Sequence, residues 1–459
     1  MRAGARRGSD DDQAPEDDRR KQDSTLRAGS DAIVVGIGYL ASFAYPLVSL
    51  PLLSRVLGAH DLGRLLFALA LVQLIVPLSD FGFGRSALRR IAVARTVEER
   101  SRVVAETLGG KAILWAGGSA VLMAIVLAVP GMREQWGMYA VGLALIGVGA
   151  AYPTWLLQGM GRVTWFALLM ALSRLVALAL LVLTVHGPED VVLAMVWQQF
   201  PLALAAVASW IMICLVWKDV HRVRTTPRAV VSALRDSWPM FVANLANVTI
   251  SASNTVVLGM VAVPVQVAYF GAAERFGNAV RGIMTGVSDA MLPRLTRGED
   301  GDAKVQRFVL VGVAGAFAAA GLTLVIAAPW FVPWYLGAEM TGAAPVTQII
   351  GVSLVLSGLQ MAQFLHATAR HRFRLVARIA AIATVCHVVL LFPAALFGGA
   401  VGAACVAIVS EALMASLYAI ASLRRRRAAR AGRTSDDQEG TTVSIPETEI
   451  DRSRGGLVR

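Results

Sequence analysis

The chain has 459 residues, of which 56% are hydrophobic and only 16% are charged, and its mean hydropathy is +0.60. A soluble protein would carry about a quarter charged residues, so this composition excludes an ordinary soluble protein. The net charge of +12 resembles that of nucleic-acid-binding proteins, but the arginines lie in short links between apolar stretches. That distribution argues against nucleic-acid binding and indicates membrane-topology signals.

Apolar stretches long enough to cross a bilayer core of ~30 Å recur along most of the chain. They predict an all-α, polytopic membrane protein with twelve transmembrane helices. The predicted spans are 31–53, 61–83, 105–129, 138–157, 163–185, 190–217, 237–260, 265–291, 307–329, 343–367, 373–396 and 399–423. The flanking segments 1–30 and 424–459 are polar and are expected to form disordered tails on the cytoplasmic side.

Arginine marks almost every second connection between these spans. The links 85–102 and 218–235 are rich in arginine, whereas the alternate links hold only Arg55, Arg64 and Arg133. By the positive-inside rule, both termini should be cytoplasmic and the number of spans should be even.

The long basic connection 218–236 divides the chain into two sets of six spans. The sequence therefore predicts an N-terminal lobe at 31–217 and a C-terminal lobe at 237–423, joined by a cytoplasmic linker. Transporters built in this way place the substrate site between related halves. The other long basic link, 85–104, is expected to form an amphipathic helix on the cytoplasmic membrane surface.

Polar side chains recur at helical spacing in two spans. In span seven, Asn244, Asn247 and Asn254 share one helix face, and in span one Tyr39 belongs to a weaker pattern of the same kind. Lipid cannot satisfy such a face, so it must meet protein or water. Hydrogen bonding between helices and the lining of a cavity both explain it, and the two alternatives stay open.

Span eight carries charged residues at membrane depth. Glu274, Asn278 and Arg281 share a face, and Arg275 is adjacent. An arginine near the bilayer centre costs roughly 2.5–3.5 kcal/mol on insertion scales, so such residues face a bundle interior or a wet cavity. We expect Arg281, Arg275 and Asn278 to bind substrate in a cavity, together with the polar residues of spans one and seven.

Three acidic residues are candidates for coupling transport to a proton or sodium gradient, with no cofactor required: Glu274, then Glu411 and Asp80. The alternative for Glu411 is a structural pair with Arg174, the deep arginine of span five. His366 and His387 are lone histidines within spans, for which packing or hydrogen bonding is the favoured interpretation.

Nothing in the sequence indicates catalysis. There is no phosphate-binding glycine loop, nucleophile elbow or zinc-protease motif, and the exterior links are too short for a catalytic domain. Cys214, Cys386 and Cys405 lack metal-binding spacing and are expected to be small buried hydrophobic residues.

Several short motifs together resemble a known family. They are Pro46 to Gly58 followed by Asp61 to Gly63, Ser79 to Arg85, Ala273 to Arg275, and Leu292 to Arg294. The chain resembles the polysaccharide-biosynthesis, Wzx-type oligosaccharide flippases of the MOP (multidrug/oligosaccharidyl-lipid/polysaccharide) superfamily across spans one to twelve.

The resemblance implies a V-shaped bundle of two six-helix lobes in the bacterial cytoplasmic membrane. It also implies the movement of an undecaprenyl-diphosphate-linked oligosaccharide to the outer leaflet for cell-surface polysaccharide, such as lipopolysaccharide O-antigen or exopolysaccharide. The pathway's polymerase and glycosyltransferases would be partners. In this family a cationic central cavity is thought to receive the anionic carrier, and Arg281 and Arg275 match that expectation by position. Span one departs from it, because it offers no charge to the cavity.

Three other functions compete with this one. A MATE-type, cation-coupled drug exporter should have an acidic cavity, whereas the deep charges here are slightly net positive. A lipid II flippase is closer, although the relatives of that kind have fourteen spans. A polymerase or ligase acting on lipid-linked glycan would need a large exterior loop, which the short exterior links oppose.

Overall fold

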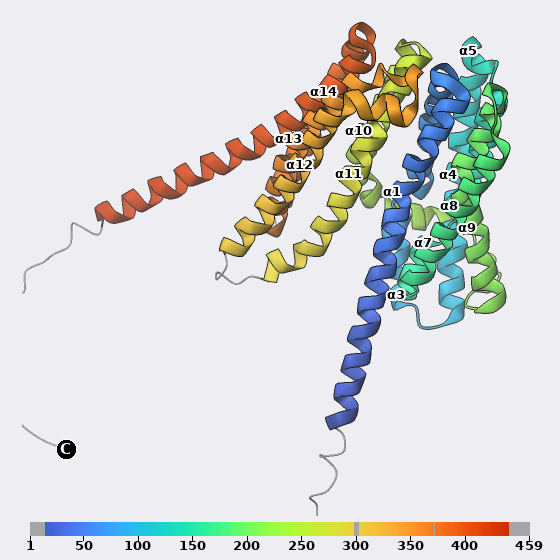
Figure 1. Cartoon of the computed structure of the whole chain (residues 1–459). Helices are drawn as coiled ribbons and strands as arrows, with labels where there is room; N and C mark the ends of the chain where they lie inside the picture. The colour runs from blue at the N-terminus through green and yellow to red at the C-terminus, as the bar shows by residue number, and fades with distance from the viewer. Residues whose placement is uncertain (1–13, 298–302, 371, 440–459) are drawn as a thin grey trace, which may run out of the picture.

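The computed structural model describes residues 14–297, 303–370 and 372–439 of the chain. Side chains are described between residues 44 and 424, apart from 239, 242–252, 285, 287–309, 369, 371 and 373. These residues form helices and no strand. Figure 1 shows that the helices form two groups, which meet at one end and separate toward the other, as the two arms of a V do. The prediction of an all-α bundle with two lobes in a V is therefore confirmed.

The N-terminal lobe contains the helices up to the basic linker. In chain order they are α1 (Ala14–Gln73), α2 (Ile75–Asp80), α3 (Phe83–Val93), α4 (Val97–Ala128), α5 (Pro130–Arg133), α6 (Trp136–Ala150), α7 (Thr154–Gly159), α8 (Val163–Thr184) and α9 (Val191–Ile211). Within this lobe α9 packs against both α6 and α8, and α1 packs against α8.

The C-terminal lobe contains five longer helices. They are α10 (Pro227–Val261), α11 (Pro264–Arg297), α12 (Ala303–Leu336), α13 (Ala343–Ala369) and α14 (Phe373–Glu439). Here α13 packs between α12 and α14, and α10 packs on α14. The principal contact between the two lobes joins α1 to α11, so these two helices determine how the lobes meet.

Glycines interrupt the two longest helices. Gly58 in α1 has φ 71° and Gly399 in α14 has φ 55°, both in the left-handed region that residues with a β-carbon rarely adopt. The apolar segment around Gly58 has 50 residues, which as one helix would extend ~75 Å, more than twice a bilayer core. The break therefore allows one helix to supply two spans, as the sequence predicted.

Eight segments of the described residues are long and apolar enough to cross a membrane. Two of them, Ala44–Val93 and Arg374–Arg424, contain the glycine breaks, and each includes residues of two predicted spans. The predicted spans 237–260 and 265–291 lie within α10 and α11, the helices that carry the polar stripes. Every predicted span thus lies in largely helical chain, although 61–83 and 138–157 are interrupted by short breaks, and this arrangement is consistent with twelve crossings.

Large apolar side chains cover the outside of the bundle. Leu183, Val389 and Phe397 are 68%, 66% and 87% exposed. A soluble monomer rarely exposes extensive apolar surface, so this surface is that of a multi-pass membrane protein. Cys214 and Cys405 are also exposed, so the prediction that the cysteines are buried is wrong for these two. The reason is that an apolar residue in a span can face lipid as readily as the protein core.

The two ends of the bundle differ in chemistry. We call the end where the lobes meet the Gly58 end and the opposite one the Gly82 end, after the glycines in their turns. At the Gly82 end α3 is amphipathic, as predicted: Phe83 and Ile91 are buried, whereas Arg85 and Arg89 are exposed.

Helix α1 starts at Ala14 and α14 continues to Glu439, so both helices extend into the segments predicted to be disordered tails. Charged residues with good helix propensity precede the apolar span in α1 and follow it in α14, which favours extension of a helix that has already formed.

Candidate functional site

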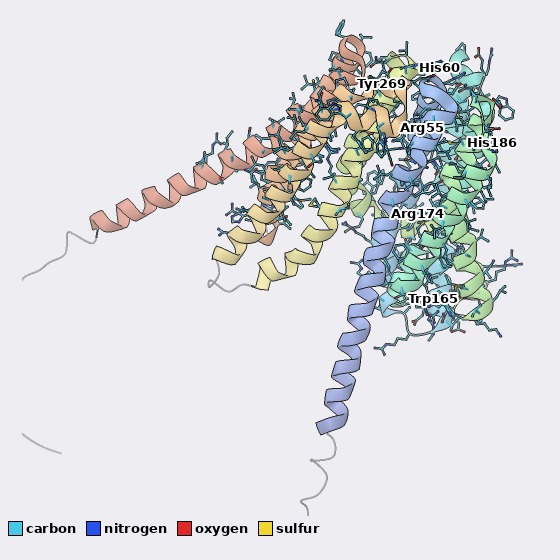
Figure 2. The ribbon with its side chains drawn as sticks, in the orientation of Figure 1. Arg55, His60, Trp165, Arg174, His186 and Tyr269 are labelled. Atoms are coloured by element: carbon cyan, nitrogen blue, oxygen red, sulfur yellow. The ribbon has the colours of Figure 1, made fainter. Side chains whose placement is uncertain are left out.

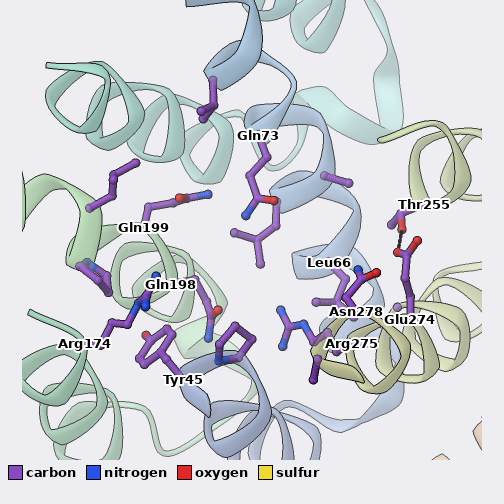
Figure 3. Close-up of a pocket in the computed structure, with 18 of the residues that line it drawn as sticks. Tyr45, Leu66, Gln73, Arg174, Gln198, Gln199, Thr255, Glu274, Arg275 and Asn278 are labelled. Atoms are coloured by element: carbon purple, nitrogen blue, oxygen red, sulfur yellow. Dashed lines mark hydrogen bonds between the residues drawn. The ribbon is translucent and has the colours of Figure 1, made fainter. Parts of the chain in front are cut away.

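A cavity of about 650 Å³ lies between the two lobes (Figure 3). Its walls come from α1, α2, α8 and α9 on one side and from α10 and α11 on the other. The polar lining residues are Tyr45, Gln73, Arg174, Gln198, Gln199, Thr255, Glu274, Arg275 and Asn278. Figure 2 places Arg174 between Tyr269 near one end of the molecule and Trp165 near the other, at mid-depth in the bundle.

The C-terminal wall contains three residues of the predicted site. Glu274, Arg275 and Asn278 of α11 all line the cavity. Glu274 accepts hydrogen bonds from Thr255 Oγ1 at 3.1 Å and from Asn254 Nδ2 at 3.4 Å. The Nη1 atom of Arg275 is buried and has no hydrogen-bond partner among the described residues. This guanidinium therefore has an unused donor at the cavity.

The N-terminal wall holds residues that sequence reasoning did not assign to the site. Arg174 of α8 and Gln199 of α9 line the cavity, and each has a buried nitrogen, Nη1 and Nε2, without a partner in the described part of the chain. Tyr45 lies between Arg174 and Arg275 in Figure 3 and donates its hydroxyl to the Trp197 carbonyl at 2.6 Å. The charge of Arg174 within a predicted span is a signal in the sequence that could have indicated this site. The sequence gives no comparable signal for which face of α9 lines the cavity.

Asn254 lies behind the cavity wall. It is buried, and its Oδ1 lies 2.8 Å from His387 Nε2, while His387 Nδ1 lies 2.8 Å from Ser410 Oγ. A chain of hydrogen bonds thus runs from Ser410 through His387 and Asn254 to Glu274. The expectation that His387 has a hydrogen-bonding role is confirmed, and Asn254 acts here as a link between helices.

Arg281 lies outside the lining of the cavity. Its Nη2 donates to Ser353 Oγ of α13 at 3.2 Å, and it is close enough to Glu411 for electrostatic interaction. Glu411 accepts from Ser357 Oγ at 2.8 Å, and its other oxygen is buried without a partner in the described structure. Arg275, and not Arg281, is therefore the arginine of α11 that faces the cavity.

Glu411 and Arg174 belong to different lobes. Arg174 lies on α8 beside Tyr45, and Glu411 lies on α14 beside Ser357, so the structural pair considered for them does not form in this structure.

Asp80 lies away from the cavity, in the turn at the Gly82 end. Its carboxylate forms an ion pair of 2.9 Å with Lys111 Nζ and accepts the Gly84 N–H at 3.3 Å. Lys111 is buried, so Asp80 supplies the charge that compensates it. The side chains of Tyr39, Asn244 and Asn247 lie outside the described residues.

Hydrogen bonds join the lobes at the Gly58 end. Arg55 Nη2 donates to the Trp334 carbonyl at 2.6 Å, and Ser54 Oγ donates to the Leu336 carbonyl at 2.7 Å. Gly63 packs directly on the Pro264 carbonyl, so closely that a β-carbon would overlap it. This end of the cavity is therefore closed by contacts of N-terminal-lobe residues with main-chain carbonyls of the C-terminal lobe.

At the Gly82 end the lobes touch along one side. Ser86 and Ser237 share a hydrogen bond of 2.6 Å, and Phe81 stacks on Phe241 with ring centroids 4.5 Å apart. These contacts tie the start of α10 to the N-terminal lobe, while α11 and α12 diverge from α1 (Figure 1). A cavity between two lobes that are closed at one end is the arrangement that alternating-access transporters use.

Comparisons with known proteins agree with this architecture. The family model described as "Polysaccharide biosynthesis protein" matches residues 28–299. Two proteins named "Putative O-antigen transporter" are similar to this chain. The one from Shigella dysenteriae is 24% identical, with 79% of this chain and 91% of that protein covered. The one from Escherichia coli (strain K12) is 26% identical, with 84% and 93% covered.

Two solved structures share the fold. The structure described as "Lipid II flippase MurJ, inward closed conformation" has a TM-score of 0.64 at 12% identity and covers 87% of each chain. An inward-facing multidrug resistance MATE family transporter of the MOP superfamily has a TM-score of 0.62 at 14% identity, covering 86% of this chain and 99% of that one. At such identities these structures establish the fold alone.

Proposed function

Since this chain belongs to the polysaccharide biosynthesis protein family, we propose that it moves a polyprenyl-diphosphate-linked oligosaccharide from the cytoplasmic to the outer leaflet of the bacterial cytoplasmic membrane. The two relatives named as O-antigen transporters support a substrate of this kind. The oligosaccharide would go on to a polymerase for cell-surface polysaccharide assembly.

One observation carries the proposal: guanidinium groups with unpartnered nitrogens face the cavity from both lobes. The charged lining residues are Arg174, Arg275 and Glu274, which give a net positive cavity. Arginine keeps its charge at any physiological pH and offers several donors to phosphate oxygens. Arg275 is placed to hold the diphosphate of a lipid-linked sugar, and a cation-binding drug exporter would need a cavity of the opposite charge.

The orientation of the protein in the membrane can be inferred from the positions of its exposed arginines. The Gly82 end carries exposed Arg85, Arg89, Arg222 and Arg224, so by the positive-inside rule it faces the cytoplasm, with both termini on that side. The closed Gly58 end then faces outward. In this state the cavity is poised to receive a lipid-linked substrate from the inner leaflet, which agrees with the proposed direction of transport.

Glu274 is the best-placed residue for coupling to a proton or sodium gradient. It is the one carboxylate among the described lining residues, and it connects to His387 through Asn254. Glu411 lies outside the cavity lining and near Arg281, and the ion pair of Asp80 with Lys111 favours a structural role for Asp80.

Complementation of a flippase-deficient strain tests the proposal. Arg275→Gln should abolish surface polysaccharide while the protein inserts at a normal level. Arg275→Lys should keep part of the activity, since lysine retains the positive charge but lacks the planar guanidinium that donates two parallel hydrogen bonds. Arg133→Gln, an exposed arginine outside the cavity, is the matched control and should be fully active. Full activity of Arg275→Gln would refute a role for this guanidinium in transport.

The related alternative is a lipid II flippase, whose substrate also carries a diphosphate. Expression in a strain depleted of its lipid II flippase separates the two functions. Rescue of growth in that strain, without rescue of surface polysaccharide in the first, would favour lipid II.

A further inference from the structure

The two walls of the cavity differ in chemistry. The C-terminal wall presents Arg275 with Glu274 and one amide, Asn278, whereas the N-terminal wall presents Arg174 with three amides, Gln73, Gln198 and Gln199, and no carboxylate among the described residues (Figure 3). A single ligand lying across the cavity would therefore meet two different sets of groups.

Arg174 has no counter-ion in the described structure. The groups that interact electrostatically with it are the hydroxyls of Tyr45 and Tyr152. Both hydroxyls donate to main-chain carbonyls, of Trp197 at 2.6 Å and of Phe166 at 2.9 Å. A half-buried guanidinium with a buried, unpartnered nitrogen and no carboxylate beside it is costly at membrane depth, which indicates that an anionic group of the ligand completes this site.

The amide side chains around Arg174 indicate that the ligand group bound there is not a phosphate. Gln199 is 6% exposed and its Nε2 has no partner among the described residues, while Gln198 uses its Nε2 on Ser49 Oγ at 3.0 Å and retains its carbonyl oxygen. Amides both donate and accept, as sugar hydroxyls do. Phosphate oxygens only accept, so a phosphate on this wall would leave the amide carbonyls unsatisfied.

We propose that the N-terminal wall is a recognition site for an acidic sugar, in which Arg174 binds the sugar carboxylate and Gln199 binds a hydroxyl. This inference rests on the proposed function and adds a substrate class to it: the sugar near the diphosphate is a uronic acid. Arg275 then holds the diphosphate on the opposite wall, and Arg174 discriminates between acidic and neutral glycans.

Binding to the purified full-length protein in detergent tests this assignment. The probes are methyl galacturonoside, methyl galactoside, which differs from it only at the carboxylate carbon, and inorganic diphosphate. The wild-type protein should bind the uronoside about tenfold more tightly than the galactoside, the difference expected for one charged hydrogen bond. Arg174→Gln should remove this preference, and Gln199→Leu should weaken binding of both sugars.

Diphosphate binding serves as the control for folding and for the proposed function. Arg174→Gln should leave it within about twofold of wild type, whereas Arg275→Gln, which loses a charged hydrogen bond to phosphate, should weaken it about tenfold or more. Equal binding of the two sugars by the wild-type protein would refute the acidic-sugar site. An equal loss of diphosphate binding in both arginine variants would also refute it, because Arg174 would then be a second phosphate ligand. A wild-type protein that prefers the uronoside but does not bind diphosphate would contradict the proposed function and leave the sugar site standing.

Discussion

The Glu339 carboxylate of the C-terminal lobe accepts the main-chain N–H of Ala59 in the N-terminal lobe at 3.1 Å. Ala59 follows the break at Gly58 and begins the second half of α1, where main-chain N–H groups have no partner within the helix. An acidic group at a helix N-terminus is stabilising, so Glu339 caps a helix of the opposite lobe. This contact must break when the Gly58 end opens.

Replacing Glu339 by alanine should shift the protein toward the state that is open at the Gly58 end. Loss of an N-cap costs about 0.5–2 kcal/mol, and the exposure of this carboxylate places it near the lower limit, so the shift should be about twofold to fivefold. Electron-spin distance measurements between labels at Arg133 and Phe397, in a background without the native cysteines, would report the lobe separation. Unchanged distance distributions would show that Glu339 does not hold this end closed.

The ion pair of Asp80 with Lys111 allows a test of whether Asp80 has a structural role or couples transport to an ion gradient. Because Lys111 is buried and Asp80 is partly exposed, Asp80→Ala should destabilise the protein more than Lys111→Met does, by about 1–3 kcal/mol after allowance for solvent screening. Thermal unfolding in detergent would measure this.

The double variant Asp80→Ala/Lys111→Met should regain most of that stability and keep its dependence on the ion gradient. A stable double variant whose transport no longer responds to the gradient would instead assign the coupling role to Asp80.

Glu274→Gln should reduce or remove the gradient dependence of transport while the protein stays folded. Glutamine keeps the size of the side chain and can still accept from Thr255, but it cannot bind a proton or carry charge. Transport into vesicles, with and without an imposed proton or sodium gradient, is the measurement. Normal transport with normal gradient dependence would exclude Glu274 and leave Glu411 as the next candidate.

Much of the fold was predictable because the partition of a segment into the membrane depends on its own residues. The spans and the shared face of Glu274 and Asn278 follow from local spacing. Arg281 shares that face too, but two helical turns place it ~10 Å farther along α11, where it meets α13 and Ser353.

The N-terminal wall was not predictable in the same way. Which face of α8 and α9 lies opposite α11 depends on how the two lobes pack, and neither helix encodes that alone. Arg174 could be recognised as a deep charge, whereas Gln199 has no distinguishing pattern in an apolar span. The glycine breaks determine where each pair of spans turns, and these can be located in the sequence. The residues that contact a turn, such as Glu339 at Ala59, belong to the other lobe and cannot be predicted from the sequence of the turn alone.

The arginine distribution predicts that both termini are cytoplasmic. A reporter that is active only outside the cytoplasm, fused after Gly187, should give a signal, whereas the same reporter fused after Arg427 should give none. An exterior signal from the second fusion would reverse the orientation assigned to the Gly82 end.

The most direct test of the account is transport by the purified protein in liposomes. A fluorescent polyprenyl-diphosphate oligosaccharide is placed in one leaflet, and the fraction that becomes accessible to a membrane-impermeant quencher is followed over time. We predict rapid exchange with the wild-type protein and with Arg133→Gln, and a rate near that of empty liposomes with Arg275→Gln. Exchange by Arg275→Gln at the wild-type rate, or no exchange by the wild-type protein under any imposed gradient, would contradict the account.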